Sequence, residues 1–310
     1  MRELALSKGG ILKRIYESRY LLILIMPALI YYIIFQYAPM FGLVVAFQDY
    51  EVFKGIMGSE WVGFKYFRYF LFENTDFFPL LRNTFLLGFY SIIFSFPAPI
   101  ILALLLNEIR NSKFKRIVQT VSYLPHFISN VILASMILMF LSPDGGMINA
   151  FLNQTFGIEP IYFMAKANLF RPIYILSGIW QGVGWGSIIY LATISGIDQN
   201  QYEAAALDGA GRWRQMRHVT IPGIVPMIVI MLILSIGRLL STSFEKVVLL
   251  YNPLTYSTAD VFSTYTYRMG ILGGEFSYTT AVGIFNGIVS FLLIIIANSI
   301  ARRVRQVSLW

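Results

Sequence analysis

Six long apolar runs, separated by short polar segments, dominate the pattern of this 310-residue chain. Each run is long enough for a helix to cross a hydrocarbon core about 30 Å thick. A membrane barrel would show short segments of alternating polarity instead. The six predicted spans are Tyr20–Gln48, Leu80–Leu106, Ile117–Leu141, Pro172–Ile197, Gly223–Leu250 and Tyr278–Ala301. The pattern therefore predicts an all-α, polytopic membrane protein with six transmembrane helices.

Composition supports the same class of protein. Hydrophobic residues make up 57% of the chain, charged residues 13%, and the mean hydropathy is +0.65, which is too apolar for a soluble domain of this size. The absence of cysteine excludes disulfides and thiolate metal ligands. The only histidines, His126 and His218, fall in different predicted layers, so we expect no metal site. We expect His126, which follows Pro125, to cap or satisfy a helix break.

The basic residues predict the orientation of the chain. With the N-terminus inside, 15 of the 24 Lys and Arg residues fall in inside segments, as the positive-inside rule requires. We therefore expect a cytoplasmic segment at 1–19, a transmembrane domain at 20–301 and a cytoplasmic tail at 302–310. The first run is too long for a cleaved signal peptide and is interpreted as an uncleaved anchor. The net charge of +8 follows from this bias and lends little support to nucleic-acid binding.

The longest outer loop, from Asp49 to Pro79, carries an aromatic run at Trp61–Phe70. An amphipathic helix resting at the lipid headgroups is the interpretation that we favour. Contact with an extracytoplasmic partner is the alternative.

A polar connector at 198–222 lies between the fourth and fifth runs. The stretch Glu203–Leu207 is a strong helix former, and its alanines would let another protein approach the backbone closely. Gly209 and Gly211 permit a sharp change of direction, because glycine accepts a positive φ without cost. Pro222 suits the first turn of the next membrane helix. We expect a short helix, a turn and a second short helix that project from the cytoplasmic face.

The connector resembles the EAA signature of bacterial ABC importer permeases. The acidic residue, two alanines, glycine and proline fall at the family spacing, with Val219 where isoleucine is usual and Ile221 where leucine is usual. The resemblance implies a protein of the bacterial cytoplasmic membrane whose coupling helix inserts into a cleft of a cytoplasmic ATPase subunit. Asp208, next to the glycine, belongs to the same candidate surface. The candidate coupling residues are Glu203, Ala204, Ala205, Asp208, Gly209 and Pro222.

The resemblance extends along nearly the whole chain, which is similar to the carbohydrate-uptake permeases of the LplB type. It is carried by Trp61-Val-Gly-Phe, Tyr123-Leu-Pro-His-Phe-Ile-Ser, Trp180-Gln-Gly-Val-Gly-Trp-Gly, Ile189-Tyr-Leu-Ala and Leu309-Trp310. It implies import of an oligosaccharide, with uronate groups in some cargoes. It also implies a second related permease in a heterodimer, two copies of an ATPase that bind ATP and Mg²⁺, and an extracytoplasmic binding protein.

Missing motifs argue against catalysis by this chain itself. No Gly-x-x-x-x-Gly-Lys-Ser/Thr occurs, so the chain has no loop of its own to cradle ATP phosphates, and no candidate nucleophile stands beside a base. We therefore expect a transport subunit without cofactors of its own. A permease for another solute such as a peptide is the runner-up. A secondary transporter or channel, and a membrane-embedded enzyme, are less favoured alternatives.

Three polar stripes are candidates for a substrate pathway. On helical geometry, Ser235, Arg238, Thr242 and Glu245 fall within one narrow arc of the fifth span, where Glu245 is a candidate partner for the arginine. The fourth span carries Ser177, Gln181, Gly184 and Ser187, and the sixth carries Thr279, Gly283, Asn286 and Ser290. The small residues fit tight helix packing better, as in Gly182-x-x-x-Gly186, whereas Gln181 and Arg238 fit packing and pathway equally. Trp180, Trp185 and Tyr190 offer aromatic faces on which sugars stack.

Overall fold

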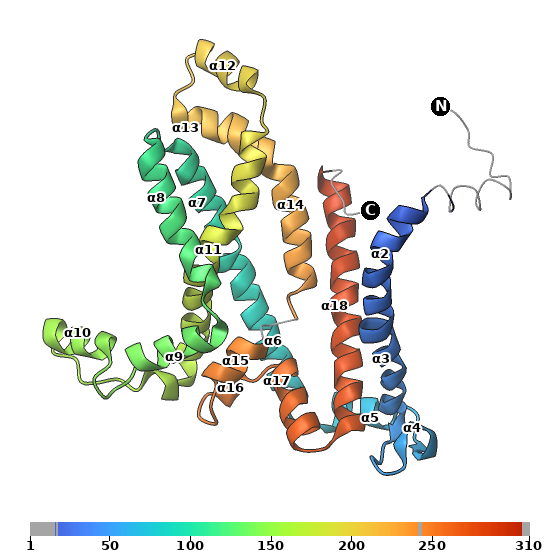
Figure 1. Ribbon diagram of the computed structural model, residues 1–310. Helices are drawn as coiled ribbons and strands as arrows, with labels where there is room; N and C mark the ends of the chain where they lie inside the picture. Colours follow the sequence, from blue (N-terminus) through green and yellow to red (C-terminus); the bar gives the residue numbers. More distant parts are fainter. Residues whose placement is uncertain (1–15, 17, 241–243, 306–310) are drawn as a thin grey trace.

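The computed structural model describes residues 16, 18–240 and 244–305 and is built almost wholly of helices (Figure 1). Five of its helices are long and apolar enough to cross a membrane, and a sixth span is possible if a bent pair of helices counts as one. The predicted all-α, polytopic class is therefore confirmed. The five helices are Arg19–Phe47, Phe77–Glu108, Ala167–Ser195, Arg212–Gly237 and Phe276–Arg303.

The first span stands at the edge of the bundle. It comprises α2 (Arg19–Tyr32), a π-helical turn, α3 (Ala38–Met40) and a 3₁₀ helix (Phe41–Phe47). None of its residues is buried before Val45, where the 3₁₀ helix packs against α18 (Phe276–Arg305). Most of this helix therefore presents apolar side chains outward.

The predicted outer loop, from Asp49 to Pro79, forms a small folded unit instead of a single surface helix. Strands β1 (Gln48–Asp49) and β2 (Glu60–Trp61) pair antiparallel around α4 (Gly55–Gly58). A helical run follows, made of α5 (Lys65–Arg68) and a π-helical turn (Tyr69–Glu73). Phe70, which is 1% exposed, anchors this run in a cluster with α6 (Phe77–Tyr90), α17 (Phe262–Thr266) and α18.

The centre of the bundle is the contact between the second and fourth spans. The second span consists of α6 (Phe77–Tyr90), a π-helical turn (Ser91–Ser95) and α7 (Pro97–Glu108), and the fourth is α11 (Ala167–Ser195). Gly186 allows close approach, because a Cβ there would lie 2.9 Å from Pro99. Near the C-terminal ends of α7 and α11, Ala103, Tyr190 and Ile194 form a core with Ile224 of α14 (Ile221–Gly237).

The third predicted span is not a straight helix. α8 (Ser112–Tyr123) and a 3₁₀ turn (Leu124–Phe127) meet α9 (Asn130–Phe140) at an angle of 98°. Pro125 lacks an N–H and disfavours a continuing α-helix, and the Ser129 hydroxyl caps the new helix by accepting from the Ile132 N–H at 3.3 Å. We call the segment Leu124–Asn130 the helix break. Beyond α9 lie α10 (Met147–Phe156) and a 3₁₀ turn at Phe163–Ala165.

The fifth predicted span is shorter than its apolar run. α14 ends at Gly237, where a Cβ would collide with the Ile294 side chain of α18, and Arg238 takes a non-helical conformation. The chain continues after residue 243 in three short helices and a π-helical turn. These are α15 (Phe244–Leu250), α16 (Tyr256–Ala259), α17 (Phe262–Thr266) and Tyr267–Leu272. Hydropathy alone did not reveal this break, because the polar residues after Gly237 are spaced so that they also fit one face of a continuous helix.

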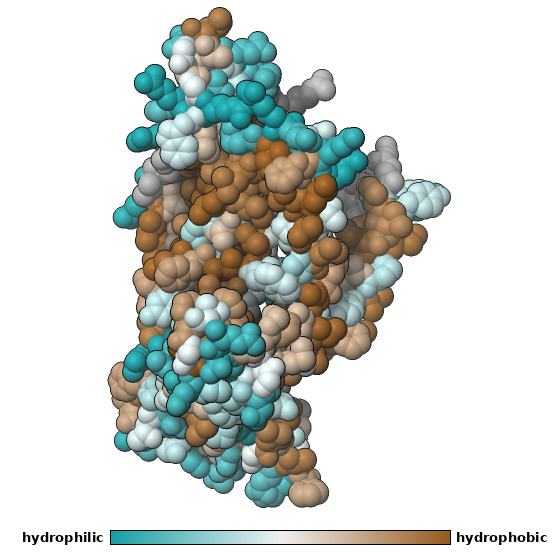
Figure 2. Space-filling model, turned by 90° about the vertical axis from the view of Figure 1, so that its left-hand side faces the viewer, coloured by the Kyte–Doolittle hydropathy of each residue, from teal (hydrophilic) through white to brown (hydrophobic). Residues whose placement is uncertain are grey.

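Hydropathy divides the molecule into three layers (Figure 2). A hydrophobic band lies between a hydrophilic end that carries α12 (Gln199–Leu207) and α13 (Arg212–Gln215) and a mixed polar end opposite it. The largest buried cluster joins α6, α9, α11 and α15 through residues such as Leu87, Ala134, Tyr174 and Val247. This packing holds α9 and α15 against the Phe170–Ile175 part of α11.

Candidate functional site

The candidate coupling loop is a helical hairpin at one end of the bundle (Figure 1). The Asp198 side chain caps α12 by accepting from the Asn200 N–H at 3.0 Å. Glu203, Ala204 and Asp208 are exposed, and Ala205 is half-buried. Leu207 is 90% exposed and Trp213 is 71% exposed, so two large apolar side chains stand free at the tip. Large apolar side chains that are exposed at the polar end of a molecule are typical of a surface that contacts another protein.

The turn after α12 depends on Gly209. Gly209 has φ +76°, and the Gly209 and Ala210 N–H groups donate to the Ala206 and Ala205 carbonyls at 3.0 and 2.9 Å. These two bonds form a Schellman cap, for which glycine in the left-handed region is the usual residue. The predicted positive φ is therefore confirmed at Gly209. Gly211 differs, since its φ of −67° is open to any residue.

Specific contacts tie the hairpin to the spans beneath it. The hydroxyls of Tyr202 and the buried Thr220 are 2.9 Å apart, which joins α12 to the next helix. Arg212 Nη1 donates to the Glu108 carbonyl at 3.4 Å and lies 3.9 Å from the Glu108 carboxylate, at the end of α7. These contacts join α12 to the helix that continues into α14, and α13 to the end of α7.

The predicted second short helix is not a separate element. Residues 212–237 form one continuous helix, so the connector runs directly into the fifth span. Pro222 consequently lies inside this helix, where a π-helical turn at Met216–Thr220 precedes it. The π turn widens the helix locally, which accommodates a residue that has no N–H to donate.

The helix break gathers several of the predicted pathway residues. Gln181 of α11 donates from Nε2 to the Ile128 carbonyl at 2.9 Å, which satisfies a backbone group that the break frees. Trp185 stacks on His126 with ring centroids 4.5 Å apart and an interplanar angle of 4°. His126 therefore lies at the break, as expected. Its contact there is made by the ring face, which stacks on Trp185. Non-helical backbone at membrane depth is typical of segments that are buried in protein or line a water-filled cavity.

A polar contact extends this surface to α15. Asn130 Nδ2 donates to Glu245 Oε2 at 2.6 Å, so the carboxylate is held beside the break. The next residue, Lys246, is buried at 4% exposure and donates to the Tyr174 carbonyl at 2.8 Å. The sequence pattern did not indicate these contacts of Asn130 and Lys246, because their partners lie 115 and 72 residues away along the chain. A charged residue within an apolar run was the signal that could have indicated Lys246.

The small residues of α11 serve packing. Gly184 is buried, and a Cβ there would collide with the Ser122 carbonyl next to the break. The Ser187 hydroxyl is buried and donates to the Gly184 carbonyl at 2.6 Å. Trp180 and Trp185 remain 45% and 47% exposed, although His126 covers one face of the Trp185 ring.

The remaining pathway residues do not join this group. The expected arc of Arg238, Thr242 and Glu245 is wrong, because α14 ends before Arg238 and Glu245 belongs to α15. Thr242 lies outside the described residues. Arg238 is exposed, and no ion pair within 18–240 and 244–303 reaches it, so the expected pair with Glu245 is absent there. Asn286 lies within α18, and its buried Oδ1 accepts no hydrogen bond from any described residue.

Known proteins resemble this chain over almost its full length. It is 48% identical over 294 residues to protein LplB of Bacillus subtilis (strain 168), covering 95% of this chain and 92% of the relative. It is also 48% identical to the polygalacturonan/rhamnogalacturonan transport system permease protein YteP of the same organism, covering 96% and 92%.

Solved structures agree with these relatives. A chain of a bacterial ABC transporter involved in the import of the acidic polysaccharide alginate superposes with a TM-score of 0.88 at 41% identity, covering 96% of this chain and 99% of that one. A MetNI methionine ABC transporter chain shares the fold at a TM-score of 0.50 and 17% identity, with 73% and 93% covered. The family described as "Binding-protein-dependent transport system inner membrane component" matches residues 95–306. The chain is therefore a multi-pass inner-membrane protein and a non-catalytic transport subunit of the binding-protein-dependent transport family, which works with a substrate-binding protein.

Proposed function

We propose that the chain is one permease subunit of an ATP-driven importer that carries oligosaccharides containing uronate groups. The observation that carries this proposal is the 48% and 41% identity to permeases whose cargoes are named as polygalacturonan/rhamnogalacturonan and alginate. Both cargoes contain sugar acids and are therefore polyanions. Membership of a family that depends on a binding protein argues against a secondary transporter or a channel.

The proposed assembly contains a second, related permease, two copies of a cytoplasmic ATPase that bind ATP and Mg²⁺, and an extracytoplasmic binding protein. The basic residues support a cytoplasmic position for both termini and for the coupling loop at 198–222. The transmembrane domain then extends over 20–301, with α4 and α5 at the extracytoplasmic end.

The coupling loop is the proposed contact with one ATPase. Glu203, Ala204, Ala205 and Asp208 form the docking surface of α12, and Leu207 supplies an exposed apolar side chain. When the ATPases close on ATP, α12 moves with the ATPase cleft in which it sits. The Tyr202–Thr220 contact transmits that movement to the fifth span.

The proposed substrate surface lies at the helix break. Gln181, Trp180, Trp185 and Glu245 supply amide, aromatic and carboxylate groups of the kind that bind sugars. Arg238 is exposed and permanently charged, so it is the proposed contact for a passing carboxylate.

Uptake measurements test this proposal. Cells that lack the gene and cells that carry it are supplied with labelled trigalacturonate, galactotriose or trialanine. We expect gene-dependent uptake of trigalacturonate. Uptake of trialanine alone would indicate a peptide permease and would refute the proposed cargo.

A further inference from the structure

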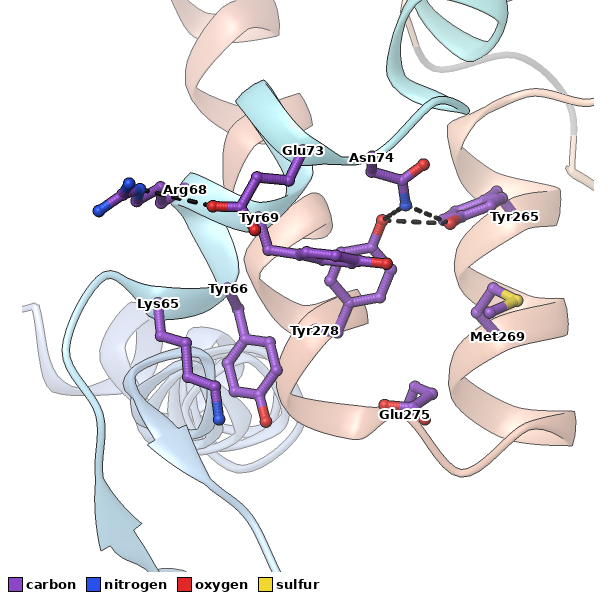
Figure 3. A pocket seen from close by; sticks show the side chains of 10 residues that line it. All are labelled: Lys65, Tyr66, Arg68, Tyr69, Glu73, Asn74, Tyr265, Met269, Glu275 and Tyr278. Carbon is purple, nitrogen blue, oxygen red and sulfur yellow. Dashed lines mark hydrogen bonds and ion pairs between the residues drawn. The ribbon is translucent and has the colours of Figure 1, made fainter.

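A pocket of about 610 Å³ lies at the end of the molecule opposite the coupling loop (Figure 3). Three segments that are distant in sequence build it: the helical run at 65–74, the end of α17 with the turn that follows it, and the start of α18. None of the residues assigned above to coupling or translocation lines it. The pocket is therefore a separate site.

The floor of the pocket is rigid and rich in tyrosine. Asn74 Nδ2 donates to the hydroxyls of Tyr265 and Tyr278 at 3.1 and 2.5 Å, and the two hydroxyls are 3.1 Å apart. Tyr265 and Tyr278 are 1% and 4% exposed, and both belong to the cluster around Phe70. This network fixes the floor, because each member is held by the other two and by the packing below.

Tyr69 supplies an open aromatic face above this floor. Its ring makes an edge contact with Tyr278, with centroids 5.4 Å apart, and the residue remains 45% exposed. Figure 3 shows the ring projecting into the middle of the pocket. An exposed ring on a fixed support is preorganised for stacking.

The charged groups of the pocket lie on two sides. Figure 3 shows Lys65 and Arg68 on one side and Glu275 on the other. Lys65 Nζ lies 3.2 Å from Asp49 Oδ2, and Arg68 Nε lies 3.5 Å from Glu73 Oε1. These pairs are largely exposed, so a ligand can replace either partner at a cost of about 1 kcal/mol or less. Within residues 18–240 and 244–303 the Glu275 carboxylate has no ion-pair partner.

We propose that this pocket binds one or two sugar units of an oligosaccharide on the extracytoplasmic side, before the cargo enters the translocation path. The C–H face of a sugar ring stacks on Tyr69, and sugar hydroxyls donate to Glu275. Arg68 donates to a uronate carboxylate where the cargo carries one. The extracytoplasmic position and the sugar cargo rest on the proposed function.

The combination of groups distinguishes a saccharide from other ligands. A lipid tail would need an apolar pocket, whereas this one has charged residues on both sides of its tyrosines. An inorganic anion would not use an exposed ring face. Aromatic faces, hydrogen-bond donors and a carboxylate acceptor within one small volume match a sugar, whose C–H faces stack on rings while its hydroxyls need polar partners.

Titration calorimetry on the assembled transporter, without its binding protein, tests the site. The probes are trigalacturonate and galactotriose. We expect Tyr69→Ala to weaken binding of both about five- to tenfold, because it removes the stacking face. Tyr69→Trp keeps a platform and should bind as the wild type does. Phe72→Ala is the matched control, since Phe72 is 81% exposed on the same helical run and does not line the pocket.

A second pair of variants separates the charged groups. Arg68→Gln should weaken trigalacturonate binding and leave galactotriose binding unchanged, whereas Glu275→Gln should weaken both. Unchanged affinities in Tyr69→Ala would overturn the proposal. It would also be overturned if Tyr69→Ala reduced only the docking of the binding protein, because the pocket would then be a protein contact. If wild-type cells take up neither sugar while Tyr69-dependent binding persists, the proposed importer function fails and the pocket assignment stands.

Discussion

The left-handed turn at Gly209 offers the sharpest test of the coupling loop. A valine at φ +76° carries a backbone strain of about 1–2 kcal/mol, since only glycine adopts this region freely. No heavy atom lies within 4 Å of the position of an added Cβ, so the cost comes from the backbone and not from a clash. Relaxing to a negative φ instead breaks the two cap bonds, each worth about 1 kcal/mol.

Either route costs about 1–2 kcal/mol, which lowers the ratio of the correctly shaped, unstrained hairpin to other states about 5- to 30-fold. We expect Gly209→Val to reduce ATP hydrolysis stimulated by the loaded binding protein to a similar extent, with normal insertion into the membrane. Gly209→Asn should lose less, because asparagine tolerates the left-handed region better than valine.

Gly211→Val is the matched control for this experiment. Gly211 is also free of contacts to an added Cβ, but its φ of −67° suits any residue. We expect near-normal stimulated hydrolysis in this variant. Normal hydrolysis in Gly209→Val, or equal losses in both valine variants, would refute the reasoning.

Three further predictions address topology, packing and cargo. Cysteines introduced at Asp208 and Glu60 of this cysteine-free chain should differ in labelling by an impermeant maleimide in intact cells, with Glu60 labelled and Asp208 protected; the reverse pattern would invert the assigned orientation. Gly184→Val should destabilise the chain by about 1–3 kcal/mol or more, because its Cβ meets the Ser122 backbone, whereas Gly182→Ala has free space; equal thermal stability of the two variants would contradict this packing. Arg238→Gln should lower uptake of trigalacturonate more than that of galactotriose, and equal losses with reduced assembly would indicate a structural role instead.

Apolar run length determined the class of this protein before any tertiary contact was known. The long runs must bury their backbone polar groups within helices in a membrane, so the polytopic all-α fold follows from the sequence alone. The turn at Gly209 was equally predictable, because helix-forming alanines followed by glycine are a local signal for a cap. Both features depend on neighbours in the chain.

Tertiary structure decided where the apolar runs are interrupted and which polar groups meet. The close packing of the end of α14 depends on the approach of Ile294 to Gly237, and the support of the helix break depends on Gln181, which is 53 residues away from Ile128. The expected arc through Arg238 failed for the same reason, since helical spacing assumes a helix that continues. The tyrosine pocket was also invisible in the sequence, because Asn74 meets Tyr265 and Tyr278 only after 191 and 204 residues of intervening chain have folded. Contacts over such separations are set by the packing of whole helices, which local pattern does not encode.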